Sequence, residues 1–212
     1  MTVTDVNVVK SAIFERPDDA NKGTLGSLLC VCGSYGMAGA AVMSAKGALR
    51  TGIGLAKCAL PRSIYPIVAQ TILESVYYSL NENADGRISK VNVPFLVSES
   101  CKSSATLVGC GLGVCDDTLK IVFSLIENST TPLVLDADAL NCVAKQPEIL
   151  LRKKAPIIIT PHPGEMSRLT GLATPLVNAE RERVALDFAQ KYGVVTCLLY
   201  TSPSPRDGAT SR

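Results

Sequence analysis

The sequence predicts an α/β domain in which a mostly parallel sheet carries helices on both faces. Apolar segments of strand length alternate with amphipathic segments of helix length, and this alternation implies right-handed crossovers between parallel strands. Residues 155–159 are apolar and rich in isoleucine, as expected for a strand that is covered on both faces. The chain has 212 residues, 47% of them hydrophobic, which is enough to bury one substantial core.

The spacing of apolar residues assigns the elements in order along the chain. We expect strands at residues 28–32, 55–60, 75–80, 106–108, 132–135, 157–159 and 194–199. We expect helices at residues 38–51, 63–69, 116–127 and 178–192, a short helix that residues 136–141 lead into, and one helix that His162 and Glu165 introduce. Residues 61–103 include the polar turn 81–86 and fit an excursion before the core resumes.

Composition and charge exclude several classes of function. Lysine and arginine number 21 against 19 acidic residues, a formal net charge of +2, and no basic run marks a nucleic-acid surface. The sequence has no stretch of about 18 apolar residues and no secretory signal at its amino terminus, so we expect a soluble, cytoplasmic protein without a membrane partner. The eight cysteines are dispersed, many inside apolar runs, so we expect reduced thiols and no structural metal.

Two glycine-rich loops follow predicted strands. In residues 33–41, Gly39 and Ala40 allow a ligand to approach the backbone, and the free N–H groups of the following helix can bind an anion. The spacing of the glycines matches neither the dinucleotide motif nor the P-loop. In residues 109–113, three glycines in five residues suggest a backbone that lies flat against something bulky. The alternative for both loops is a tight turn with close helix packing.

Two further strand ends carry polar side chains. Residues 135–141 place Asp136 and Asp138 after a strand, where a carboxylate can hold a hydroxyl or a magnesium-bound water, although Asp138 can equally cap the next helix. His162, the only histidine, precedes Glu165 by three residues and also follows a strand. The alternative for His162 is a loop cap or a bond to a backbone carbonyl.

These four loops lie at the carboxyl ends of predicted strands of one sheet, which is where open α/β sheets bind ligands. Abundant backbone N–H groups, few bulky side chains and a His/Glu pair suit a large phosphorylated ligand. They also suit a reaction that depends on positioning and on phosphate electrostatics.

The chain resembles the ADP-dependent NAD(P)H-hydrate dehydratases of the ribokinase-like superfamily. The segments that carry the resemblance are NKGT (21–24), CGSYGMAGAA (32–41), GALRTG (47–52), GCGLG (109–113), LDADALN (135–141) and ITPHPGE (159–165). They occur in order from about Lys22 to Val195. Asn21 stands where the family usually has histidine. The resemblance implies a three-layer sandwich and, for the full-length protein, a homo-oligomer.

The resemblance also implies an activity and its site. The family phosphorylates the hydroxyl of the S-epimer of hydrated NADH or NADPH, with ADP as phosphoryl donor and Mg²⁺ as cofactor, and then eliminates phosphate. By position, Ala40, Gly111 and His162 would contact the hydrated dinucleotide. Glu165 stands where related kinases keep an acidic residue that organises magnesium around the phosphates.

The resemblance ends near residue 199. The family would continue into a Lys-Gly-x-x-Thr loop and later a glycine-rich loop with the catalytic aspartate, whereas residues 200–212 contain two prolines and no apolar periodicity. We therefore expect residues 1–199 to form a partial domain with a sheet that is incomplete at its carboxyl end, and residues 200–212 to form a non-family tail. Asp207 does not match the catalytic aspartate, so no catalytic residue is assigned and we expect no turnover.

Two alternatives stay open. One is a kinase of the same superfamily that phosphorylates a vitamin precursor such as a pyrimidine or thiazole alcohol. The other is a non-catalytic nucleotide-binding or assembly module, which would use the strand edge that an incomplete sheet leaves exposed.

Overall fold

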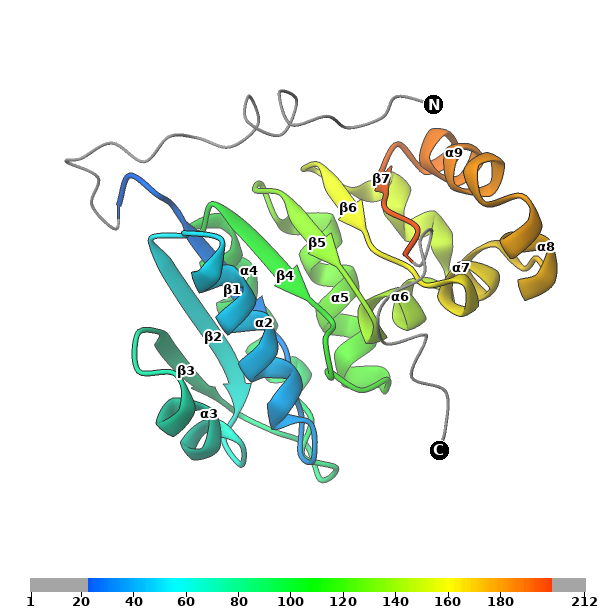
Figure 1. Ribbon diagram of the computed structural model, residues 1–212. Coiled ribbons are helices and arrows are strands. Elements are labelled where there is room, and N and C mark those ends of the chain that lie inside the picture. The colour runs from blue at the N-terminus through cyan, green and yellow to red at the C-terminus, as the bar shows by residue number, and fades with distance from the viewer. Residues whose placement is uncertain (1–22, 200–212) are drawn as a thin grey trace, which may run out of the picture.

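A seven-stranded parallel sheet forms the centre of the protein (Figure 1). The computed structural model describes residues 23–199, so the tail predicted at residues 200–212 and the motif residues 21 and 22 lie outside the described residues. The strands are β1 (Ser27–Val31), β2 (Leu55–Pro61), β3 (Val76–Leu80), β4 (Ala105–Val108), β5 (Leu133–Leu135), β6 (Ile157–Ile159) and β7 (Val195–Thr196). Their order is β3-β2-β1-β4-β5-β6-β7, and every neighbouring pair is parallel, which confirms the predicted fold class.

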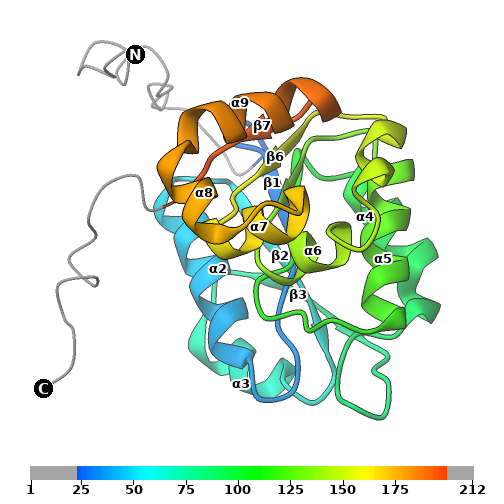
Figure 2. The same cartoon turned by 90° about the vertical axis from the view of Figure 1, so that its right-hand side faces the viewer.

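Helices lie on both faces of the sheet and complete three layers (Figure 2). They are α2 (Ala38–Arg50), α3 (Tyr65–Thr71), α4 (Val93–Cys101), α5 (Asp116–Asn128), α6 (Asp138–Val143), α7 (Pro163–Thr170), α8 (Thr174–Ala179) and α9 (Arg181–Tyr192), with 3₁₀ turns η1 (Lys90–Asn92) and η2 (Pro147–Arg152). Helices α2 and α3 cover one face, and α4, α5 and α6 lie on the other (Figure 1). Among the described residues, no helix has the length and apolar character needed to cross a membrane.

Each face of the sheet has its own core. The larger core joins strand residues such as Leu29 and Leu135 to α5 and α9, where Leu125 and Phe188 are buried. The smaller core lies under α2 and α3 and includes small side chains such as Cys30, Ala41 and Ala45. Small residues let α2 pack close to the strands. The buried thiols therefore act as small hydrophobic groups, and all eight cysteines are free.

Three elements differ from the sequence prediction. Within residues 61–103, β3 matches the strand expected at residues 75–80 and joins the sheet, but the helix α4 is one that the periodicity did not show. The buried residues of α4 are Leu96 and Ser100, and a buried serine breaks the apolar pattern. The Ser100 hydroxyl is satisfied by hydroxyl contacts with Thr106 at 2.9 Å and Ser129 at 2.7 Å.

The carboxyl-terminal elements also differ. The predicted helix 178–192 is two helices, because Glu180 leaves helical geometry at φ −124° and ψ 38°. Val177 and Val184 are both buried and seven residues apart, a spacing that also fits one continuous helix. The predicted strand 194–199 is regular only at Val195–Thr196, although Cys197 N still donates to the Ile159 carbonyl at 2.8 Å.

Among residues 23–199, no helix covers β5, β6 and β7 on the face of the sheet that carries α2. Val134, Ile158 and Val195 stand in register across β5, β6 and β7. Ile158 is 37% exposed and Val195 is 60% exposed, whereas Ile157 and Ile159 on the opposite face are buried. Within residues 23–199, helices cover this face only as far as β4 (Figure 1).

The two faces of β6 should respond differently to the same substitution. Ile157→Thr places a hydroxyl in the larger core and should lower the free energy of unfolding by about 2–3 kcal/mol. Ile158→Thr keeps a β-branched side chain on the bare face and should cost less than about 1 kcal/mol. Urea unfolding of the two variants makes the comparison, and equal losses would mean that another part of the chain covers Ile158.

Candidate functional site

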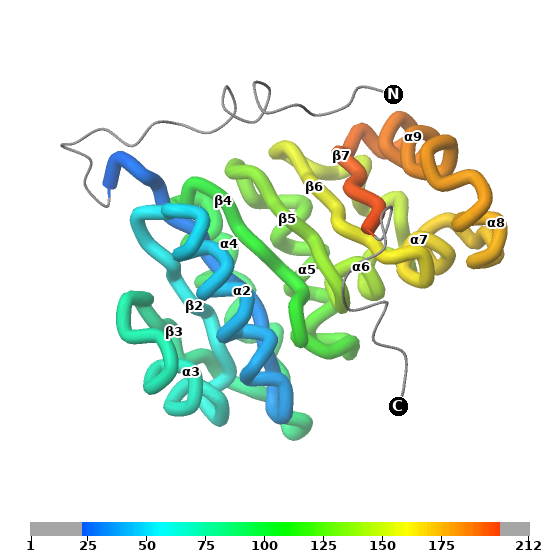
Figure 3. Tube along the Cα trace, viewed as in Figure 1, coloured from blue at the N-terminus to red at the C-terminus, as the bar shows by residue number. Residues whose placement is uncertain are grey.

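The order of the strands creates a crevice between β1 and β4. The chain runs from β1 outward through β2 to β3 and then returns to place β4 on the other side of β1 (Figure 3). The loops after β1 and β4 therefore leave the sheet in opposite directions, and such a switch point is the usual ligand site of an open α/β sheet. These loops are residues 32–37 and 109–115. The second contains the predicted segment 109–113, whereas the first predicted segment, 33–41, runs on into the first turn of α2, which holds Gly39 and Ala40.

Ala40 and Gly111 meet at this crevice. A Cβ on Gly111 would lie 2.7 Å from the Cβ of Ala40 in α2, so the start of α2 and the loop after β4 approach each other only because both residues are small. Gly111 also has a φ of +65°, which disfavours any residue with a side chain. The loops are joined by Gly33 N, which donates to the Cys110 carbonyl at 2.8 Å, and by the Ser34 hydroxyl, which donates to the Gly111 carbonyl at 2.8 Å.

The amino terminus of α2 opens at the same place. Its N-cap residue, Met37, makes no side-chain capping bond, and a Cβ on Gly39 would meet nothing within 4 Å. Free N–H groups at the start of a helix attract anions, and open space beside them lets an anion approach. The structure therefore has the geometry for the anion contact that the sequence predicts at residues 33–41.

The loop after β5 nests against the loop after β4. A Cβ on Gly109 would overlap the Asp136 carbonyl oxygen and crowd Ala139, and Gly109 has a φ of +125°. Ala139 N donates to that carbonyl at 3.0 Å and closes a turn around Ala137. Ala137 has φ +49° and ψ −114°, close to the first central position of a type II′ turn, which normally takes glycine. It is the only non-glycine residue with positive φ in the described part of the chain.

The carboxylates of this loop link neighbouring strand ends. Asp136 accepts hydrogen bonds from the Thr160 hydroxyl at 2.7 Å and from the Cys110 thiol at 3.2 Å. Asp138 accepts from Gly113 N at 2.8 Å and from the Asn141 side-chain amide at 3.3 Å. The alternative that Asp138 caps the next helix is wrong, because Asp138 is the first residue of α6 and Ala137 occupies the cap without a side-chain bond.

His162 is the N-cap of α7. Its Nδ1 accepts from Gly164 N at 3.0 Å and Glu165 N at 3.4 Å, and Pro163 occupies the first helical turn. An Nδ1 that accepts places the proton of a neutral ring on Nε2, which lies 3.3 Å from Glu165 Oε1. The capping alternative for His162 is thus confirmed. The ring is still 41% exposed, so it can also touch a ligand.

Glu165 is buried and turned back toward His162. Its Oε2 accepts from His162 N at 2.9 Å, which completes a capping box. Burial raises the pKa of the Glu165 carboxyl above its ordinary value. The nearby Asp136 carboxylate raises this pKa further, whereas the His162 N–H and Arg168 lower it in part.

The polar links extend to Arg168 on α7, whose Nε donates to the Asn141 side-chain oxygen at 2.8 Å. Asp136 therefore joins the loops after β4, β5 and β6 through its side chain. The loop after β1 is joined to them through the Ser34 hydroxyl. Sequence reasoning missed Ser34, Asn141, Thr160 and Arg168. No local signal marks them, since each acts by contacting a segment far along the chain.

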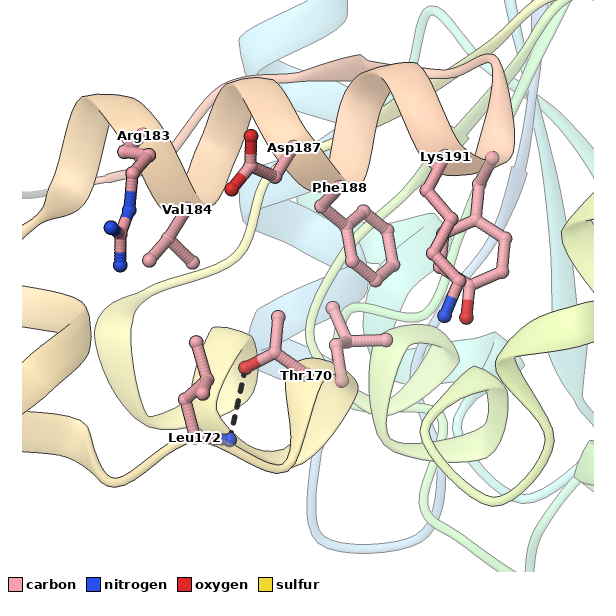
Figure 4. A pocket seen from close by; sticks show the side chains of 9 residues that line it. Thr170, Leu172, Arg183, Val184, Asp187, Phe188 and Lys191 are labelled. Atoms are coloured by element: carbon pink, nitrogen blue, oxygen red, sulfur yellow. Dashed lines mark hydrogen bonds between the residues drawn. The ribbon is translucent and has the colours of Figure 1, made fainter.

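The described residues also form a cavity away from these loops and a cavity beside the first of them. One of about 230 Å³ lies between the carboxyl-terminal part of α7 and α9, with Val184 and Phe188 toward its interior and Arg183, Asp187 and Lys191 along α9 (Figure 4). None of the predicted site residues lines it. The other, of about 420 Å³, lies between Tyr35 of the first glycine-rich loop and residues 82–86 of the loop after β3, and so adjoins the crevice.

A family model described as NAD(P)H-hydrate dehydratase matches residues 28–202, which include all four loops. The chain belongs to this family. A bifunctional NAD(P)H-hydrate repair enzyme of Thermofilum pendens is 38% identical over 176 residues, which are 83% of this chain and 34% of that protein. The chain spans about a third of the length of the first curated relatives it matches.

Solved structures support the same family and the ribokinase-like fold. An ADP/ATP-dependent NAD(P)H-hydrate dehydratase of Bacillus subtilis, co-crystallised with ATP/Mg²⁺, aligns with a TM-score of 0.74 and 27% identity, covering 92% of this chain and 65% of its own. A ribokinase-like superfamily protein of Enterococcus faecalis aligns with a TM-score of 0.70 and 20% identity, covering 89% of this chain and 62% of its own. The second likeness shows the fold alone. The predicted ribokinase-like architecture is therefore confirmed.

The strained turn at Ala137 should be relieved by glycine. Ala137→Gly removes the side chain that disfavours positive φ, and should raise the free energy of unfolding by about 1 kcal/mol after the entropic cost of glycine. Ala144→Gly at the other end of α6, where φ is −60°, is the matched control and should lower it by about 1 kcal/mol. Urea unfolding measures both, and a loss in Ala137→Gly would show that the turn is unstrained.

The buried Glu165 carboxyl should make stability depend on pH. Because its folded pKa is raised, the folded state holds the proton more tightly, so stability is greatest below the unfolded pKa and falls as pH rises through the folded value. Glu165→Gln should remove this fall. The free energy of unfolding of the variant should therefore rise relative to that of the wild type between acid and neutral pH. Urea unfolding at a series of pH values measures the trend, with the exposed Glu182→Gln as control. A parallel pH dependence in Glu165→Gln and wild type would refute it.

Proposed function

We propose that this chain binds hydrated NADH or NADPH and forms the dinucleotide-binding part of an ADP-dependent NAD(P)H-hydrate dehydratase. The observation that carries the proposal is the convergence of four loops at the carboxyl ends of β1, β4, β5 and β6, which are adjacent in the sheet. Family membership supports the same substrate class. The reaction would restore the reduced nicotinamide by loss of the hydroxyl that hydration adds.

Ala40 and Gly111 are proposed to form the floor on which the hydrated ring lies. Both residues are small and in close approach, so a ligand ring can reach the backbone of α2 and of the loop after β4. The uncapped start of α2 beside them offers N–H groups to a phosphate of the dinucleotide. This combination favours a dinucleotide over the small alcohol of a vitamin-precursor kinase.

His162 is proposed to contact the substrate with the exposed part of its ring. Glu165 lies behind the ring, and the two backbone N–H groups on Nδ1 fix its tautomer and orientation. A fixed ring can hold a substrate hydroxyl in one position, which is the positioning that a dehydration needs. Glu165 would then act on the substrate through His162.

The described residues do not form a ready set of direct magnesium ligands. The carboxylate oxygens of Asp136, Asp138 and Glu165 are all engaged by protein groups. Within residues 23–199, no group of three or more histidine, cysteine or acidic side chains is placed to hold a metal ion. We keep Glu165 as the residue proposed to organise magnesium around the phosphates without coordinating it directly, and ADP as the proposed phosphoryl donor.

A matched pair of substitutions on α2 tests the proposed floor. Ala40→Val inserts a branched side chain beside Gly111 and should weaken NADPH binding by about tenfold or more, because the ring can no longer reach the backbone. Ala48→Val carries the same cost in helix propensity on the same helix and should leave the affinity unchanged. Nicotinamide fluorescence titration gives both dissociation constants, and equal values for the two variants would reject this floor.

The purified wild-type chain also distinguishes the dehydratase from the alternative functions. ADP-dependent conversion of hydrated NADH by residues 1–212 would contradict the expectation of no turnover and support the complete dehydratase. Tighter binding of a pyrimidine alcohol than of NADPH would instead favour the vitamin-precursor kinase.

A further inference from the structure

The loop after β3, residues 82–88, is a compact turn held by its own hydrogen bonds. Glu82 and Ile88 form an antiparallel bridge. The Asn83 side-chain oxygen accepts from Asp85 N and Arg87 N, each at 3.1 Å, and Gly86 N donates to the Asn83 carbonyl at 3.0 Å. These internal bonds hold the backbone of the turn in one conformation.

This loop touches both sides of the β1/β4 crevice. On the β1 side, Tyr35 N donates to the Gly86 carbonyl at 2.9 Å. On the β4 side, the Asn83 amide donates to Asp117 Oδ2 at 2.9 Å at the start of α5. The loop thus spans the mouth of the crevice, next to the meeting point of Ala40 and Gly111.

Arg87 projects from this loop onto the second glycine-rich loop. A side chain at Gly113 would collide with the Arg87 side chain, whose Cδ would lie 2.8 Å from the added Cβ. The guanidinium therefore lies directly on the backbone of the loop that carries Gly111. Gly113 has a φ of +76°, so both the space and the backbone conformation suit glycine there.

The guanidinium of Arg87 contacts the Cys115 side chain and forms one exposed ion pair. Its ion-pair partner is Asp85 at 3.3 Å, and the side chains of Arg87 and Asp85 are 32% and 69% exposed. An exposed ion pair of this kind contributes little, so an incoming anion displaces Asp85 at small cost. Arg168, on the far side of the site, is instead bonded to Asn141 within the network that joins the loops.

We propose that Arg87 binds a phosphate group of the dinucleotide at the mouth of the crevice. The assignment rests on the proposed function, because it requires a ligand that extends outward from Ala40 and Gly111. Such a ligand carries a pyrophosphate, and the NADPH form carries a further phosphate on its ribose. The planar guanidinium can donate two parallel hydrogen bonds to either group.

Three substitutions test the assignment in the full chain, with NADPH and NADH as fluorescent probes. Arg87→Gln should weaken NADPH binding by about tenfold. An equal loss for NADH identifies the pyrophosphate, and a loss for NADPH alone identifies the ribose phosphate. Arg87→Lys keeps the charge but loses the planar pair of N–H donors. Its affinity for NADPH should lie between those of Arg87→Gln and the wild type. Arg152→Gln, which removes a similar exposed ion pair with Glu127, is the control and should bind as wild type does.

Asp85→Asn provides a readout that misfolding cannot imitate. Loss of the competing carboxylate should tighten NADPH binding by about twofold to threefold, and the gain should vanish when Arg87→Gln is added. Unchanged affinity of Arg87→Gln for both probes would overturn the role of Arg87 and leave the proposed function standing. Absence of dinucleotide binding by the wild-type chain would overturn both.

Discussion

The lack of a side chain at Gly109 is the constraint on which the candidate site depends. Its backbone runs so close to the Asp136 carbonyl that any Cβ would overlap it. This contact sets the loop after β4 directly on the turn after β5, and only then can the Asp136 carboxylate reach Cys110 on one side and Thr160 on the other. The strand ends are thereby held in one arrangement before any ligand binds, which lowers the ordering cost of binding.

The site combines a rigid base with a more adaptable rim. Asp136, Asp138 and Glu165 use their oxygens inside the protein, and Ala137 holds a strained turn that its surroundings stabilise. The exposed charges of Asp85 and Arg87 stand at the mouth instead. The rigid, buried part of the site suits chemistry that needs exact placement. Recognition of a charged end of the ligand tolerates the movement of the exposed rim.

The sequence predicted the sheet well because buried strands of isoleucine, leucine and valine leave a strong local pattern. It located all four loops, since each follows such a strand, and it placed Ala40 and Gly111 in segments that the structure brings together. It could not show α4, whose buried face includes Ser100, or the break at Glu180, which preserves the apolar spacing. The roles of Asp138 and Asn141 were also hidden, because they depend on contacts between separate loops.

The pairing of β1 with β4 has a consequence for the order in which the protein is made. Ser27 N bonds to the hydroxyl of Ser104, 77 residues later, whereas β2 follows β1 closely in the chain. On the ribosome, β1 therefore gains its first neighbour early and keeps its other edge open until β4 has been synthesised. An open edge on a strand as apolar as β1 invites pairing with other nascent chains. The switch point that creates the ligand crevice thus also leaves an apolar strand edge unpaired while 77 residues are synthesised.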